Sequence, residues 1–180
     1  MIPFALTLIT SVFLLIAIVW LGNRRPGYRH AEHTISELGE VRAADGRLVS
    51  FGVFLPVGVA LLLAAHLVRP ADERAALLAL CIAVGYAVAA FFPCDPGSPL
   101  WGSNRQMVHN LGGGVEYFGG AVALGRLAEV HGPVFTAAAF TVGAAGVALS
   151  LPSLKVRGLV QRVAEAVLFG GLLWALWRVV

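Results

Sequence analysis

Six apolar stretches in the amino-acid sequence constrain the fold more than any other feature. An α-helix needs about 20 residues to cross a bilayer at about 1.5 Å rise per residue. Prolines, glycines and arginines separate the stretches, as expected where membrane helices end. We predict one bundle of six transmembrane helices over residues 1–180. The spans lie near 2–22, 49–68, 74–92, 107–127, 132–151 and 157–178.

The composition agrees with a membrane location. Hydrophobic residues make up 58% of the chain and charged residues 13%, and the mean hydropathy is +0.82. Soluble domains are about half apolar and about a quarter charged. We therefore infer an all-α polytopic membrane protein with a single domain, in contact with membrane lipids. The net charge of +3 is scattered among apolar runs, which argues against a nucleic-acid partner; a homo-oligomer stays an alternative to a monomer.

The basic residues indicate how the helices are oriented. Six spans place both termini on one side of the membrane and the three loops after the first, third and fifth spans on the other. Nine Lys and Arg residues lie in or next to these loops, and four lie at the opposite ends. Because cytoplasmic segments are rich in Lys and Arg, we predict cytoplasmic loops and both termini outside.

Three polar segments, 28–40, 91–110 and 155–165, are predicted to meet on this cytoplasmic side. Ionisable groups within a membrane are costly and usually face the interior of the bundle. We therefore expect a polar pocket of His, Asp, Glu and Ser side chains at the cytoplasmic interface.

The first of these segments has a helical pattern. If residues 29–39 form a helix, His30, His33 and Glu37 share one face. This favours an interfacial helix or a re-entrant segment between the first two spans. A helix whose polar face only meets lipid head groups is the alternative.

Histidines and a carboxylate in the three segments suggest a metal centre. His30, His33 and His109 with Asp95 form a ligand set suited to a divalent transition metal, zinc first. In this hypothesis the metal activates a water, which Asp95 ligates or orients.

Other polar residues complete the predicted catalytic site. Ser36 and Asn110 would bind the developing oxyanion, and Glu37 would fix a histidine tautomer. Cys94 acting as a nucleophile with His109 as its base is the alternative chemistry.

A further polar group lies deeper in the spans. Glu116 lies well inside the fourth span, while Gln161 and Glu165 follow one stripe of the sixth with Arg162 beside it. An acid at this depth needs a partner. We expect either a structural clamp between these residues or an ion or proton relay.

Short motifs in the chain resemble the DUF998 family, multispanning bacterial and archaeal proteins of unknown function. They are Ser36-Glu37-Leu38-Gly39, Phe92-Pro93-Cys94-Asp95 and His109. The resemblance implies a helical fold in a prokaryotic plasma membrane and an important interfacial cluster.

A looser likeness connects the chain with membrane hydrolases of the alkaline ceramidase and adiponectin-receptor type. That family pairs a serine, an aspartate and three histidines with zinc. The same residue types occur here as Ser36, Asp95, His30, His33 and His109.

These patterns predict three alternative functions. The first is a metal-dependent hydrolase acting on a lipid or another amphiphile. The second is a small transporter or relay that uses Glu116, Arg162 and Glu165. The third is a structural or partner-binding membrane protein.

Overall fold

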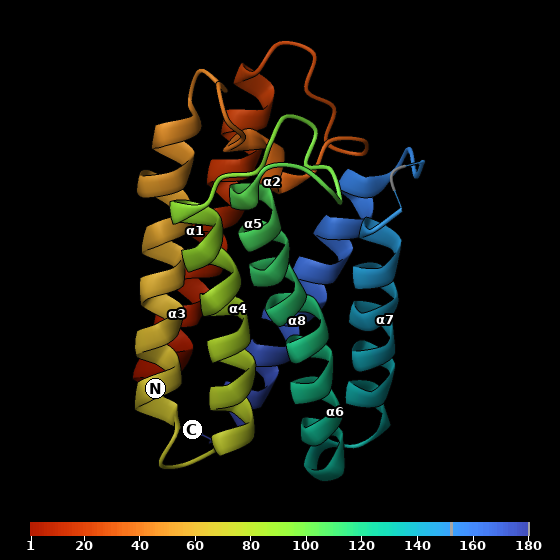
Figure 1. Ribbon diagram of the computed structural model, residues 1–180. Helices are drawn as coiled ribbons and strands as arrows, with labels where there is room; N and C mark the ends of the chain where they lie inside the picture. Colours follow the sequence, from red (N-terminus) through yellow and green to blue (C-terminus); the bar gives the residue numbers. More distant parts are fainter. Residues whose placement is uncertain (152, 180) are drawn as a thin grey trace.

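The computed structural model describes residues 1–151 and 153–179, which form an all-helical bundle without β-strands (Figure 1). Six long helical rods run along the bundle. They are α1 (Ile2–Arg24), η1 and α3 (Leu48–Phe54 and Leu55–Val68), α4 (Glu73–Phe91), α5–η2–α6 (Asn104–Gly114, Val115–Gly119 and Gly120–His131), α7 (Pro133–Leu149) and α8 (Arg157–Val179). A short helix, α2 (Ile35–Leu38), lies between α1 and η1.

Four of the rods are long and apolar enough to cross a membrane: α1, η1–α3, α4 and α8. The apolar helix α7 is shorter, and the α5–η2–α6 rod carries polar residues. The predicted helical membrane fold is confirmed, and the helices match the predicted apolar stretches closely. That all six rods cross the bilayer stays a prediction.

Local sequence signals explain where several helices begin. Asp72 caps α4 by accepting hydrogen bonds from the backbone N–H groups of Arg74 and Ala75. Ser103 caps α5 in the same way by accepting from Gln106. Prolines near the first positions of α1 and α7 suit a helix start, where a backbone donor would lack a partner in any case.

Both termini lie at one end of the bundle, and the long loops gather at the other end (Figure 1). The core consists of large aliphatic side chains from several helices, including Leu61, Leu78 and Leu168, which are fully buried. By contrast, α1 exposes a long row of apolar side chains such as Ile9 and Ile16. An apolar outer surface of this kind suits contact with lipid chains.

The segment 29–39 differs from the predicted helix, since only Ile35–Leu38 is helical. Thr34 and Glu37 form a capping box, in which each side chain binds the other's backbone N–H, and this starts the helix at Ile35. Glu37 and Leu38 are buried. The second half of the segment therefore packs against the bundle, and no amphipathic helix forms over residues 29–39.

Candidate functional site

The loop end of the bundle is closed by a network that we name the polar cap: residues 25–47 and 93–106 together with Arg162. Arg162 on α8 is one centre of the cap. Its guanidinium donates to the backbone oxygens of His30 (2.5 Å) and His33 (3.0 Å) and to the Tyr28 hydroxyl (2.8 Å). Gly158 allows this close approach, because a Cβ there would collide with the same two backbone oxygens. Arg162 therefore fixes the first loop on α8.

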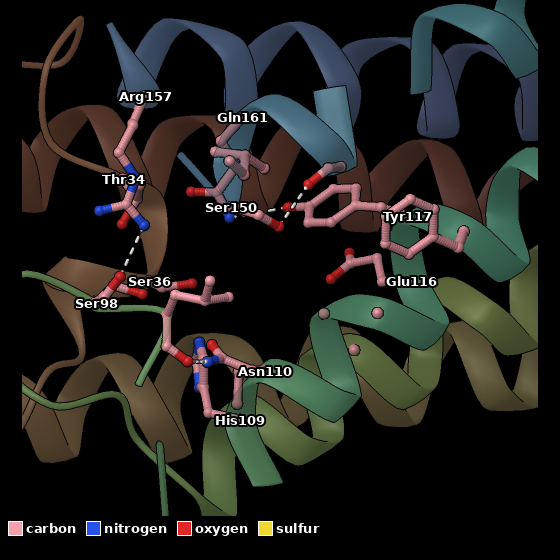
Figure 2. Close-up of a pocket in the computed structure, with 18 of the residues that line it drawn as sticks. Thr34, Ser36, Ser98, His109, Asn110, Glu116, Tyr117, Ser150, Arg157 and Gln161 are labelled. Carbon is pink, nitrogen blue, oxygen red and sulfur yellow. Dashed lines mark hydrogen bonds between the residues drawn. The ribbon is translucent and has the colours of Figure 1, made fainter. Parts of the chain in front are cut away.

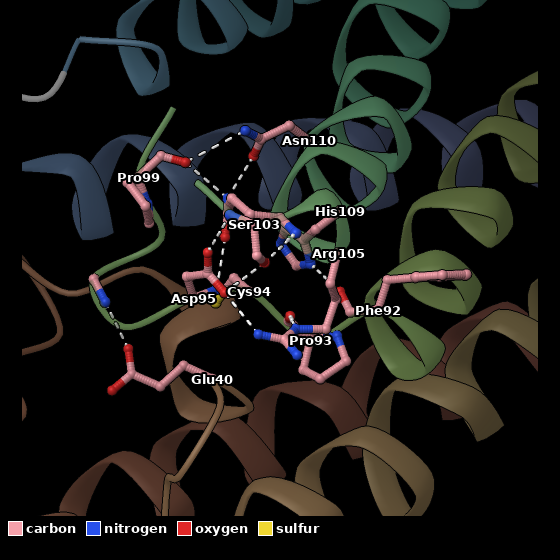
Figure 3. A network of polar contacts seen from close by, with 12 residues as sticks. Glu40, Phe92, Pro93, Cys94, Asp95, Pro99, Ser103, Arg105, His109 and Asn110 are labelled. Atoms are coloured by element: carbon pink, nitrogen blue, oxygen red, sulfur yellow. Dashed lines mark hydrogen bonds and ion pairs between the residues drawn. The ribbon is translucent and has the colours of Figure 1, made fainter. Parts of the chain in front are cut away.

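Asp95 is the second centre of the polar cap (Figure 3). Its carboxylate accepts hydrogen bonds from the Ser103 backbone N–H (2.7 Å) and hydroxyl (2.8 Å), and it pairs with Arg105 at 2.7 Å. These donors, the Ser103 backbone first, hold the pKa of Asp95 below its ordinary value. Gln106 accepts from the Asp95 backbone N–H at 2.6 Å. Asp95 therefore organises the loop before α5.

A pocket of about 140 Å³ lies just below the polar cap, between α5, η2, α7 and α8 (Figure 2). Seven of the ten polar residues that line it have hydroxyl or amide side chains. The ten polar lining residues are Thr34, Ser36, Ser98, His109, Asn110, Glu116, Tyr117, Ser150, Arg157 and Gln161. Glycines of α4, α5 and α7 also line the pocket and leave room in it. A polar cavity within apolar helices is the usual form of a small-molecule site in a membrane protein.

Glu116 is the most unusual group in this pocket. The residue is only 6% exposed, and its Oε1 atom has no hydrogen-bond partner among the described residues. Figure 2 shows the carboxyl group directed into the cavity. A buried polar atom without a partner costs free energy unless something else binds it.

His109 supplies a second free acceptor. Its Nδ1 lies 2.8 Å from the Phe92 backbone oxygen. Since a backbone oxygen can only accept, Nδ1 carries the proton and Nε2 is the acceptor. No donor among the described residues bonds Nε2, and the ring lines the pocket.

Behind Glu116 lies a second buried acid, Glu165 of α8. The two carboxyl groups are direct neighbours. Glu165 accepts hydrogen bonds from the hydroxyls of Tyr86 (3.0 Å) and Tyr117 (2.8 Å), and Gln161 donates to Tyr117 at 2.9 Å. Neither acid forms an ion pair among the described residues. Glu116, Gln161 and Glu165 thus lie close together, whereas Arg162 contacts the first loop.

The π-helical segment η2 explains how two adjacent polar residues both face inward. Neighbouring residues on an α-helix point about 100° apart, so one of the pair would usually face outward. In the wider η2 turn, both Glu116 and Tyr117 are buried. Gly85 on α4 lies directly against the Glu116 side chain, where a Cβ would collide with it. Single π-turns inside α-helices are frequent at functional sites.

A comparison with protein families matches residues 8–178 to DUF998, described as a protein of unknown function. The chain belongs to the DUF998 family. No curated protein and no solved structure matches it. The family resemblance is therefore confirmed, and the likeness to ceramidase and adiponectin-receptor type hydrolases is not shown.

In this DUF998 member the predicted zinc ligands are not brought together. No three His, Cys, Asp or Glu side chains in residues 1–151 and 153–179 are arranged to hold a metal ion. His30 contacts Arg162 and Asn23, whereas the His33 ring accepts from the Arg29 backbone N–H. His109 lies in the pocket and Asp95 in the polar cap. The residues present do not fit the three-histidine centre.

The other predicted catalytic residues separate into two groups. Ser36 and Asn110 line the pocket together with His109, as the convergence of the three segments predicted. Glu37 binds Thr34 in the capping box and no histidine ring. Cys94 is buried and donates to the Ser36 backbone oxygen at 3.3 Å. Burial raises the pKa of the Cys94 thiol to about 12, so the thiol stays protonated and is a poor nucleophile.

Several residues of this DUF998 site had no place in the sequence-based predictions. Thr34 could have been found, because Thr followed three positions later by Glu is the sequence pattern of a capping box. Tyr86 could have been noticed as a polar tip within an otherwise apolar span. Ser98 and Ser150 line the pocket, but nothing in their sequence surroundings distinguishes them from ordinary loop or helix-end serines.

Proposed function

We propose that this DUF998 protein binds the polar end of a lipid or another amphiphile in the pocket. The observation that carries the proposal is Glu116, whose buried carboxyl group lines a polar cavity and has one oxygen without a hydrogen-bond partner among the described residues. Its neighbour in the cavity, His109, also offers an unpaired acceptor. Two free acceptors inside one cavity favour binding of a ligand over a purely structural role.

An amphiphile fits this position better than a fully water-soluble molecule. The pocket lies beside the partly exposed Gly113 and Gly114 of α5, and exposed apolar side chains such as Leu111 and Val147 lie nearby on α5 and α7. Apolar side chains on the outside of a membrane bundle suit contact with acyl chains. A polar head could occupy the pocket while its chains remain among the lipids.

The test is to fill the pocket wall with a side chain. A Cβ at Gly113 would meet nothing within 4 Å, so Gly113→Leu can extend into the open space without a clash at its Cβ. Gly125 in α6 has the same open surroundings but does not line the pocket, so Gly125→Leu is the matched control.

Native mass spectrometry of the purified full-length protein measures the amphiphile that it retains from the membrane. We expect wild type and Gly125→Leu to retain it and Gly113→Leu to lose most of it. Equal retention by all three proteins, or no retained amphiphile in wild type, contradicts the proposal.

A proton relay is the second candidate, because Glu116 and Glu165 are buried neighbours without a cation beside them. Two such carboxyl groups are most stable when they share a proton, and a shared proton can pass between them. Glu165 does not line the pocket. Glu165→Gln should therefore abolish proton flux in proteoliposomes if the relay operates, and leave amphiphile retention intact. Flux equal to that of wild type excludes the relay.

A further inference from the structure

We propose that the head group bound in the pocket carries a primary ammonium, and that it enters sideways from the bilayer between α5 and α7. This inference rests on the proposed function and names its ligand class. Two independent features support it: the unpaired acceptors that line the pocket, and the open space beside Gly113 and Gly114 of α5.

Two acceptors that line the pocket have no donor among the described residues: Glu116 Oε1 and His109 Nε2. The Asn110 amide donates to the backbone oxygens of Pro99 and Leu100. The Gln161 amide donates to Tyr117 and accepts from the Ile35 backbone N–H. Neither amide therefore donates to Glu116 Oε1 or to His109 Nε2, and both of these atoms remain free to accept.

A ligand that satisfies this pocket must donate hydrogen bonds and balance a carboxylate. A primary ammonium has three N–H donors and a positive charge, so it can donate to Glu116 and to a further acceptor that lines the pocket. A trimethylammonium has no N–H group and would leave both acceptors unpaired. The site therefore discriminates between these two head groups by hydrogen bonding.

Arg157 also lines the pocket, and its side chain suits a phosphate in the same head group. Its terminal nitrogens donate to the backbone oxygens of Gly97 (3.1 Å) and Ser98 (2.7 Å). Its Nε–H is buried and has no acceptor among the described residues. An Arg donor of this kind suits a phosphate. An ammonium near Glu116 and a phosphate near Arg157 describe an ethanolamine phospholipid.

The route into the pocket follows from the angle of the fourth rod. Figure 1 shows α6 beside α7, whereas α5 tilts away from α7 toward the loop end. The pocket extends from Gly113 and Gly114 of α5 to Gly146 and Ser150 of α7. Nothing lies within 4 Å of a Cβ at Gly113 or Gly114. The exposed apolar side chains of Phe118 and Val147 flank this space, so an acyl chain can rest there while its head lies inside.

The experiment titrates the full-length protein in detergent with three probes: a phosphatidylethanolamine, the phosphatidylcholine with the same chains, and free phosphoethanolamine. Native mass spectrometry gives the dissociation constants. We expect the ethanolamine lipid to bind about tenfold or more tightly than the choline lipid, because a buried acceptor left unpaired costs at least about one factor of ten.

Glu116→Gln removes the carboxyl group that would bind the ammonium and keeps the shape of the side chain. It should weaken binding of the ethanolamine lipid by about tenfold or more, since the ion pair in the pocket is lost. Glu129→Gln is the matched control, because Glu129 is an exposed acid on α6 outside the pocket. The thermal midpoint of each variant shows that it is folded.

Each outcome decides the inference. Equal affinity for the two lipids, or unchanged affinity in Glu116→Gln, overturns the ammonium assignment. Free phosphoethanolamine binding as tightly as the lipid overturns the sideways entry. If the choline lipid binds as tightly as the ethanolamine lipid and Gly113→Leu weakens binding of both, the proposed function stands and this inference fails. If wild type retains no lipid, both fail.

Discussion

The polar cap and the pocket lie next to each other at the loop end, and they use their polar groups in different ways. In the polar cap, Asp95 accepts from Ser103 and Arg105, and Arg162 donates to three backbone oxygens and a hydroxyl. In the pocket, Glu116 and His109 each keep an acceptor without a donor. The two regions contain the same types of residue.

This difference in hydrogen bonding indicates which polar residues have a structural role. A saturated group contributes to folding stability and has little capacity left for a ligand, whereas an unsaturated buried group reduces stability until a ligand binds it. Substitutions in the polar cap should therefore lower thermal stability. Isosteric substitutions in the pocket should leave stability nearly unchanged and affect binding instead.

The largest expected effect comes from Arg162→Met, which removes the guanidinium and keeps a long apolar side chain. The backbone oxygens of His30 and His33 lose their donor, and hydrogen bonds from charged groups are worth about 1.5–3 kcal/mol each. We expect a loss of about 3 kcal/mol in unfolding free energy, measured as a large drop of the thermal midpoint in detergent. The exposed Arg126→Met is the control. A midpoint equal to that of the control would show that the polar cap does not hold the loop.

A smaller loss is expected for Asp95→Asn, and it should depend on pH. Because the pKa of Asp95 is lowered in the folded protein, the unfolded chain takes up the proton first as the pH falls. The stabilisation is therefore complete above the ordinary aspartate pKa of about 4 and is lost below it. Thermal midpoints of wild type and variant should differ at pH 7 and converge below about pH 4. A constant difference across this range would refute the charge-based explanation, and Asp45→Asn serves as the control.

The next effect is a pH dependence carried by His30. Burial, and then the nearby Arg162, lowers the pKa of His30 below its ordinary value. The unfolded chain therefore binds the proton first, so stability is full above about pH 6.5 and falls as the pH drops below that value. The thermal midpoint of His30→Gln should decrease less than that of wild type between pH 7 and pH 5. The exposed His66→Gln should follow wild type; a parallel decrease in all three proteins would contradict this role.

The sequence predicted the helices well because one strong physical signal controls them. Apolar runs of membrane length leave little freedom in where a helix begins, so α1 and α8 match the predicted spans almost to the residue. An even number of rods then places the three polar segments at one end. Their meeting is confirmed by contacts such as that between the Ile35 backbone N–H and Gln161 at 2.6 Å.

The details of the site could not be predicted, because they depend on contacts between distant segments. The helix expected over 29–39 gives way to turns, since Arg162 binds the backbone oxygens that a helix would have used internally. As a result, Arg162 contacts the first loop and not Glu116. The His30 ring contacts Arg162 and does not join a metal-binding group with His33, His109 and Asp95. The π-turn that turns both Glu116 and Tyr117 inward also leaves no periodic signal in the sequence.

The smallest effect on stability is expected for Glu116→Gln. This variant tests most directly whether the pocket differs from the polar cap. Glutamine has the same shape and removes a buried acid that no cation balances among the described residues. An amide of the same shape avoids the cost of burying an unpaired acid, so the unfolding free energy should change by less than about 1 kcal/mol. The thermal midpoint in detergent without added lipid measures this. A loss comparable to that of Arg162→Met would place Glu116 among the structural residues, and the distinction between polar cap and pocket would disappear.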